Sequence, residues 1–326
     1  MAIIDWVRCI YKDGWHNAFT DLQWFKGKYY ACFRNALSHT SPEGKIVVIA
    51  SSDLYRWERV AVPVNTSGDD RDPHLIVAGD RLYVIVGSNF WGNSVPDFDN
   101  DYRFIQTYCS YTNDGINWSK PKQIYQDNYW VWGVGYEKGI FYGLAYGGNE
   151  PRHPRSIKQL HLVSSLDGLE WEKVSQVCPN GSEATFRITD NGNMRIAIRD
   201  KNDSRLTIAE AKPPFYKWDI ADVDKVIPSP KLFEVGGREY LIGRRHLQNP
   251  SDPQLFIDRR TSIWQIDDHK IEHILDLPSS GDTSYAGVLL RKDGKLIISY
   301  YSQHDIKYGR EHWKYPSNIY LAQIQL

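Results

Sequence analysis

Residues of catalytic or ligand-binding type stand at the ends of apolar segments along the chain. They comprise three carboxylates, four arginines and two aromatic residues: Asp21, Asp72, Glu183, Arg34, Arg71, Arg199, Arg244, Trp132 and Tyr285. Charged groups at the ends of buried segments are costly unless they serve a purpose, and clusters of them mark functional sites. Arginine can hold a carboxylate through two parallel hydrogen bonds. The combination therefore predicts a pocket for a sugar, most naturally an acidic one.

Two hydrolytic mechanisms are open to these residues. A phenol with a pKa of about 10 is a poor nucleophile at neutral pH and needs a carboxylate to take its proton, so Tyr285 would need Glu183. Ordinary glycosidases instead pair two carboxylates, which Asp21, Asp72 and Glu183 could supply. Histidines in loops, among them His39, could move protons.

Six similar hairpins must position these residues. Equivalent starts at Asp21, Pro73, Trp132, Glu183, Pro230 and Tyr285 are separated by 52, 59, 51, 47 and 55 residues. Units of about 50 residues with four short strands each are typical of β-propeller blades. We therefore expect an all-β fold, a six-bladed β-propeller that forms a single domain over residues 1–326. A five-bladed ring is the alternative, because the boundaries of the fifth copy are the least clear.

Segments at the two ends of the chain are expected to close the ring. Residues 2–7 can pair beside the last strand, residues 318–324, which would remove the exposed edges of an open array. Three further segments share the pattern Ser/Thr-x-Asp-x-x-x-Trp and begin at Ser51, Thr112 and Ser165. Asp and Gly favour turns and Trp packs a hairpin onto its neighbour, so we expect these segments to be structural turns.

The propeller geometry predicts that the candidate site residues converge. Innermost strands line the centre of the ring, and the second strand of each hairpin returns to the same end. The polar residues at both positions should then meet at one mouth of the central channel.

Several motifs resemble the sialidase superfamily, and the resemblance covers essentially the whole chain. The Ser/Thr-x-Asp segments are similar to the Asp-boxes, or BNR repeats, of that family. Gly181-Ser-Glu183, Ala197-Ile-Arg199 and Asp282-Thr-Ser-Tyr285 match its catalytic segments. The resemblance implies a sialidase-type propeller with Tyr285 as nucleophile, Glu183 as its base and Arg199 as the middle of three carboxylate-binding arginines. Arg244 and Arg259 are both candidates for the third.

Two positions depart from the family pattern. Its first-blade arginine is absent, since this stretch reads Phe19-Thr-Asp-Leu22, and Asp21 takes the region. Its general acid, an Asp in the loop after the first hairpin, has no counterpart in residues 35–43. We therefore expect Asp21 or Asp72 to act as general acid, with Asp21 favoured, and His39 and Asp282 to join Trp132 and the arginines in substrate binding.

Composition excludes several classes of function. The chain has 39 Lys+Arg against 40 Asp+Glu, which lacks the basic footprint of a nucleic-acid-binding protein. No apolar run reaches the length of a membrane helix. The four cysteines form no CxxC pair, and no motif indicates a metal or a cofactor. The start, MAIIDWVRCI, shows no secretory signal, so we expect a cytoplasmic protein or a chain whose signal has been removed.

The sequence thus predicts a glycoside hydrolase of sialidase-like type that cleaves a terminal, acidic sugar from a glycan or oligosaccharide. A non-catalytic carbohydrate-binding propeller is the second hypothesis, with exposed Trp91, Trp130 and Trp132 as stacking platforms. A lyase acting on uronates, with Tyr285 or a histidine as base, is the third. Convergent charged groups favour an enzyme over a lectin.

Overall fold

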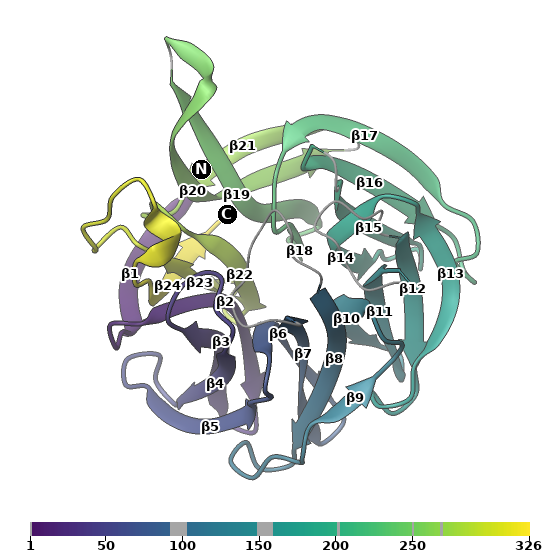
Figure 1. The fold of residues 1–326 in the computed structure, drawn as a ribbon. Helices are drawn as coiled ribbons and strands as arrows, with labels where there is room; N and C mark the ends of the chain where they lie inside the picture. Colours follow the sequence, from purple (N-terminus) through teal and green to yellow (C-terminus); the bar gives the residue numbers. More distant parts are fainter. Residues whose placement is uncertain (1, 92–102, 149–158, 201–202, 250, 268–269) are drawn as a thin grey trace.

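The computed structural model describes residues 2–326 except 92–102, 149–158, 201–202, 250 and 268–269 (Figure 1). Across these residues the protein is an all-β propeller, and its strands form a ring of sheets around a common centre. The helical structure of the described part is a single 3-10 turn, η1 (His312–Lys314). No helix in the described part is long and apolar enough to cross a membrane.

Four of the sheets have four strands each. One has the order β1 (Ile3–Tyr11), β24 (Asn318–Gln325), β23 (Leu296–Ser302), β22 (Ser284–Leu290). The second is β10 (Tyr129–Glu137), β11 (Ile140–Gly147), β12 (Gln159–Ser165), β13 (Glu172–Cys178). The third is β14 (Gly181–Ile188), β15 (Met194–Asp200), β16 (Arg205–Ala211), β17 (Asp219–Val226). The fourth is β18 (Lys231–Val235), β19 (Arg238–Asn249), β20 (Asp252–Asp267), β21 (Lys270–Asp276).

The remaining strands form one eight-stranded sheet, so the expectation of six separate four-stranded blades is corrected. It contains β2 (His16–Phe25), β3 (Lys28–Ala36), β4 (Gly44–Ser51), β5 (Glu58–Val64), β6 (Asp69–Ala78), β7 (Arg81–Trp91), β8 (Arg103–Thr112) and β9 (Lys122–Ile124). One parallel bridge between Gly44 and Asp69 joins β4 to β6. Glycine permits this approach, because a Cβ on Gly44 would lie 2.1 Å from Asp69 Oδ1.

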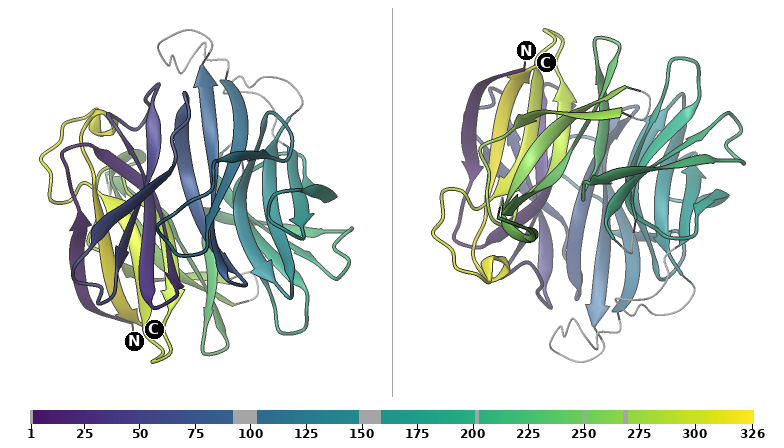
Figure 2. Two further views of the ribbon diagram at one scale, coloured as in Figure 1. Left: turned by 90° about the horizontal axis from the view of Figure 1, so that it is seen from below. Right: turned by 90° about the horizontal axis from the view of Figure 1, so that it is seen from above.

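The expected ring closure is confirmed. Strand β1 pairs antiparallel with β24, from Ile3 opposite Gln325 to Tyr11 opposite Ile319. Figure 2 shows the two chain ends side by side at one end of the molecule. The first strands of the six expected hairpins, β2, β6, β10, β14, β18 and β22, contact one another in succession around the ring. Side chains at the starts of these strands are thereby brought together.

The core lies between neighbouring sheets, and the three Ser/Thr-x-Asp segments adopt the same turn at its edge, where Leu54 and Trp171 are buried in it. In each turn the first hydroxyl accepts a hydrogen bond from the N–H three residues later, and the Asp carboxylate accepts one from the N–H three residues after it. Apolar side chains such as Phe33 on β3, Ile297 on β23 and Leu321 on β24 pack the eight-stranded sheet against the sheet that contains both ends of the chain. This packing fixes the rigid frame on which the site residues stand.

Candidate active site

Backbone irregularities at the starts of the inner strands direct side chains toward the centre of the ring. The pairing register shifts between Ala18 and Asp21, between Arg71 and His74, between Gly181 and Ala184, and between Ser284 and Gly287. Such bulges re-aim side chains and are common beside active sites. Phe19, Asp72 and Tyr285 lie at these shifts, and Ser229 lies just before β18. All four have φ between +46° and +60°. Left-handed backbone at such residues is costly and clusters at functional sites.

Tyr285 and Glu183 meet although 102 positions separate them in the chain. The Tyr285 hydroxyl donates a hydrogen bond of 2.7 Å to Glu183 Oε1. The same oxygen accepts a bond of 2.8 Å from Arg199 Nη1, and Glu183 Oε2 accepts one of 2.9 Å from the backbone N–H of Ser229. On the other side, Thr20 on β2 donates to the Tyr285 carbonyl oxygen. Neighbouring sheets of the ring therefore fix the pair.

The electrostatics of the pair set its resting protonation state, with the proton on the phenol and the charge on the carboxylate. Burial would raise the pKa of Glu183. The charge of Arg199 and the hydrogen bonds that Glu183 accepts outweigh burial and hold this pKa below its usual value. Burial, followed by the negative charges of Glu183 and Asp72, raises the pKa of Tyr285 well above its usual value. At neutral pH the phenol is therefore protonated and hydrogen bonded to an ionised acceptor.

Asp72 is a buried carboxyl group near this pair. Its Oδ2 accepts a bond of 3.3 Å from Trp132 Nε1, whereas its buried Oδ1 has no hydrogen-bond partner in the described structure. Burial is the main reason that its pKa rises to about 7, and the charge of Glu183 adds to the effect while Arg71 opposes it. The group can therefore both give and take a proton near neutral pH.

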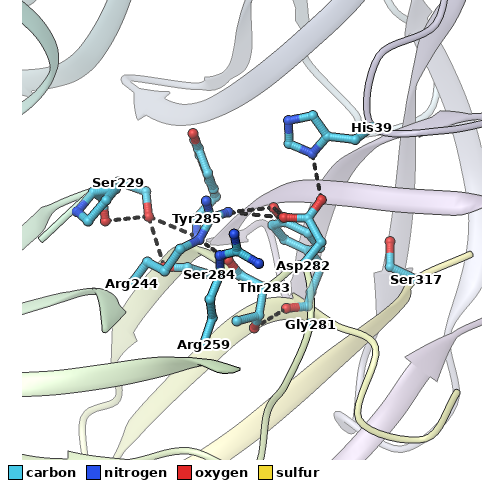
Figure 3. Close-up of polar contacts among 12 residues, drawn as sticks. His39, Ser229, Arg244, Arg259, Gly281, Asp282, Thr283, Ser284, Tyr285 and Ser317 are labelled. Carbon is cyan, nitrogen blue, oxygen red and sulfur yellow. Dashed lines mark hydrogen bonds and ion pairs between the residues drawn. The ribbon is translucent and has the colours of Figure 1, made fainter. Parts of the chain in front are cut away.

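Asp282 is the centre of a second network, which Figure 3 shows beside Tyr285. Its carboxylate contacts His39 Nδ1 at 2.5 Å and His16 Nε2 at 3.0 Å. It also accepts bonds from the Tyr301 hydroxyl at 2.8 Å and from Arg244 Nη2 at 3.1 Å. Arg244 is thereby held with its guanidinium carbon 5.5 Å from the centre of the Tyr285 ring.

His16, His39 and Asp282 could also be considered as metal ligands, since their ligand atoms lie within 4.8 Å of one another. Both imidazoles, however, already contact the Asp282 carboxylate. The Arg244 guanidinium binds the same carboxylate, and a metal cation there would be repelled by it. We therefore interpret the three residues as a group that holds Arg244 in place, with Asp282 binding the guanidinium and the two histidines contacting Asp282.

Two of the four predicted arginines share a carboxylate that the sequence interpretation overlooked. Arg34 Nε lies 2.6 Å from Asp69 Oδ1, and Arg71 Nη1 lies 3.1 Å from Asp69 Oδ2. The Arg34 side chain has no exposed surface, so the expectation that it contacts substrate is corrected. Arg71 is 11% exposed and also donates to the His39 carbonyl oxygen, so it remains at the edge of the site.

Asp21, which the sequence favoured as general acid, lies apart from the tyrosine. Its carboxylate accepts backbone bonds of 2.9 Å from Leu22 and from Leu75. The Lys231 ammonium lies 3.9 Å and the His74 imidazole 3.8 Å from the carboxylate oxygens. Among the described residues, no hydrogen bond or ion pair joins it to Tyr285, Glu183 or Asp72. The bulge at the start of β2 turns Phe19, not Asp21, toward the Tyr285 ring.

Two of the three tryptophans proposed as exposed stacking platforms are buried. Trp130 is 5% exposed and Trp132 is 3% exposed. The Trp132 ring packs edge-on against Tyr285 and His74, so it supports the site from within. Trp91 is half-buried on β7. The expectation of a face of exposed tryptophans is therefore wrong for Trp130 and Trp132.

Sequence reasoning also missed His16, Ser229 and Tyr301. His16 opens β2 ahead of the expected start. The polar run Asp69-Asp70-Arg71-Asp72 is the sequence signal that could have pointed to Asp69, which the sequence analysis did not name. Tyr301 lies on β23, one position before its last residue, Ser302. No sequence signal distinguishes the Ser229 backbone N–H.

No model of a known protein family and no curated protein sequence matches the chain. Solved structures do resemble it. A Trypanosoma rangeli sialidase in complex with the inhibitor DANA superposes with a TM-score of 0.69 at 14% identity, over 95% of this chain and 55% of that one. The same sialidase in complex with sialic acid gives 0.65 at 16% identity, over 94% and 54%. A GH32 β-fructofuranosidase of Bombyx mori gives 0.57 at 14% identity, over 98% and 62%.

The chain therefore spans a little over half the length of the sialidases that it resembles. The likeness establishes its fold as a propeller of the sialidase-like type, which glycoside hydrolases of more than one family share.

Proposed function

We propose that the protein is a glycoside hydrolase that removes a terminal, acidic sugar from a glycan. The hydrogen bond between Tyr285 and Glu183, with Arg199 and Arg244 beside it, is the observation that carries this proposal. Sialidases and a GH32 enzyme among the structures that resemble this chain support the same class of reaction.

The first step would form a bond between the Tyr285 oxygen and the anomeric carbon. The phenolic proton moves to Glu183 Oε1 as the phenolate oxygen attacks, and the bond to the leaving oxygen breaks. Asp72 in its protonated form gives its proton to that oxygen. Water then attacks the anomeric carbon and its proton passes to Asp72, while the bond between that carbon and the Tyr285 oxygen breaks. Glu183 returns its proton to the released phenolate oxygen. Two displacements at one carbon retain its configuration.

The arginines would bind the carboxylate of the sugar and select an acidic substrate. Arg199 presents a side chain that is 30% exposed, and Arg244 presents one that is 13% exposed. Each is already held by one carboxylate, Glu183 or Asp282, which leaves further N–H donors for a ligand. A neutral nucleophile such as Tyr285 suits attack beside a substrate carboxylate, because an anionic nucleophile would be repelled.

The proposal is tested with chromogenic glycosides of sialic acids, uronates and neutral pyranosides. We expect turnover of an acidic glycoside, and a loss of about a thousandfold or more in kcat for Tyr285→Phe and for Glu183→Gln. Tyr300→Phe is the matched control: Tyr300 is buried on the same strand as Tyr301 and donates only to the Pro278 carbonyl oxygen. Its turnover should equal that of the wild type.

Three results would redirect the proposal. Near-wild-type turnover by Tyr285→Phe together with its loss in Asp21→Asn and Asp72→Asn would require a two-carboxylate mechanism. A product that absorbs in the ultraviolet would identify a lyase. Binding of acidic glycans without any cleaved product would leave a carbohydrate-binding propeller.

A further inference from the structure

A cavity of about 320 Å³ adjoins the candidate active site but is separate from its catalytic pair. Its lining residues are His39, Thr40, Arg244, Arg259, Asp282, His312 and Trp313. Arg244 and Asp282 connect it to the Tyr285 site, whereas Tyr285, Glu183 and Arg199 do not line it. A group bound deep in this cavity would thus be a different group from one held between Tyr285 and Arg199.

The charge of Arg259 lacks a direct carboxylate partner. Among the described residues, no carboxylate forms an ion pair with its guanidinium, and its side chain makes one hydrogen bond, to His312 Nε2 at 2.7 Å. Figure 3 shows Arg259 together with Arg244 beside Asp282. The adjacent Arg260 differs, because it is paired with Asp258. The cavity therefore carries an excess of positive charge.

The bond to His312 orients Arg259 and leaves most of its donors free. Arginine can only donate, so His312 Nε2 accepts, and the proton of its ring lies on Nδ1, which donates to the Arg310 carbonyl oxygen at 3.3 Å. A guanidinium has five N–H donors in a planar fork. The fork is thus fixed in place with donors available for an oxyanion.

The loop that carries His312 and Trp313 is tied down at several points. Gln303 Nε2 donates to the carbonyl oxygens of His312, Tyr315 and Pro316, and Gln303 Oε1 accepts the backbone N–H of Asp282. The His39 N–H donates to the Trp313 carbonyl oxygen at 2.9 Å. Trp313 is nonetheless 40% exposed, which leaves part of its ring available to a sugar.

We propose that this cavity binds a second anionic sugar unit of the substrate, with its carboxylate or sulfate on Arg259 and its ring against Trp313. This inference rests on the proposed function and narrows the substrate to a glycan with at least two adjacent units, the second of them anionic. The shared chemistry is an oxyanion on a pyranose, and the test separates carboxylate from sulfate.

Equilibrium binding by titration calorimetry, with three pairs of probes, tests the inference. Each pair has an acidic terminal sugar, and only one member of the pair carries an anion on its second unit; in the third pair the second sugar itself also differs. The pairs are digalacturonate and its second-unit methyl ester, sulfated and unsulfated glucuronyl-N-acetylgalactosamine, and disialic acid and sialyl-galactose. We expect the wild type to bind the member with the second anion at least about tenfold more tightly in one pair, as suits a charge-assisted contact.

Arg259→Gln should abolish that preference, and Arg260→Gln, the matched control, should keep it. Trp313→Ala should weaken both members of the pair equally while binding of the terminal monosaccharide stays the same. The inference is overturned if no pair shows a preference, or if Arg259→Gln weakens both members and the monosaccharide alike. Circular dichroism confirms that each variant is folded.

Hydrolysis of the same probes separates this inference from the proposed function. A preference that depends on Arg259 without any cleavage would contradict the hydrolase and keep the second anion site. Cleavage of the probes with equal affinity for both members of every pair would support the hydrolase and contradict the second anion site.

Discussion

Replacing Asp72 by asparagine should stabilise the protein at alkaline pH while it removes activity. The carboxyl group is buried, and its pKa is about 7 instead of the usual 3.8. A raised pKa means that the folded state holds the proton more tightly than the unfolded chain does. Wild-type stability therefore declines as the pH rises from 3.8 to about 7 and stays level above that range.

The size of the effect follows from the shift. One pKa unit corresponds to about 1.4 kcal/mol, so ionised Asp72 costs the folded state about 4 kcal/mol above pH 8. In Asp72→Asn the side-chain amide oxygen would still accept the Trp132 N–H, but the amide N–H₂ would take the place of the unpartnered Oδ1. An unsatisfied buried donor costs about 1–3 kcal/mol. We therefore expect a net gain of about 2 kcal/mol for the variant at alkaline pH.

Urea unfolding at pH values from about 4 to 9, followed by tryptophan fluorescence, measures the difference. The variant should be less stable than the wild type at the acid end of this range and more stable at the alkaline end. Asp114→Asn is a control, because backbone and side-chain hydrogen bonds from Asn117 and others lower the pKa of this exposed Asp. The whole pH range lies above the usual pKa of 3.8, so this variant should be less stable than the wild type by an amount that does not change with pH. A difference between Asp72→Asn and the wild type that does not change with pH would refute the reasoning.

Three further predictions concern the same frame. The value of kcat/KM should decline above about pH 7, where Asp72 loses its proton. On the acid side it should decline only below the usual pKa of glutamate, because the pKa of Glu183 is lowered. A flat alkaline limb would contradict the role of Asp72. Arg199→Ala should weaken the binding of acidic substrates about tenfold to a hundredfold. It should also move the acid limb of the pH profile to higher pH, because Arg199 lowers the pKa of Glu183. Equal kinetics for acidic and neutral glycosides in both the wild type and the variant would count against this prediction. Gly44→Ala should destabilise folding by about 3 kcal/mol in urea, because its Cβ would lie 2.8 Å from Arg34 Nε in the buried Arg34–Asp69 pair; an unchanged midpoint would show that the bridge can open.

The repeat in the sequence was sufficient to predict the all-β propeller and the ring closure. Hairpin turns such as Lys26-Gly27, where both residues have positive φ, are local, and their spacing alone indicates how many strands follow one another. The sequence could not predict that β4 and β6 join into one sheet. That bridge depends on the backbone approach between Gly44 and Asp69, which are distant in the chain. The single-domain organisation stays a prediction.

The candidate site shows the same division between local and tertiary information. Strand starts and motifs indicated that Tyr285 and Glu183 would face each other, because equivalent positions in a ring converge. The partner of each charge could not be predicted, since a local bulge decides which side chain turns inward. The bulge in β2 directs Phe19 to the tyrosine and leaves Asp21 with backbone N–H groups.

Residue types and their spacing therefore determined which chemical groups the centre of the ring would contain. Only the tertiary structure decided which of them are exposed and which are paired. Arg34 and Arg71 have the same charge and both stand at strand ends, yet one is fully buried against Asp69 and the other reaches the site. Burial and pairing depend on contacts between sheets that are distant in sequence, and those contacts set each pKa and each available hydrogen bond.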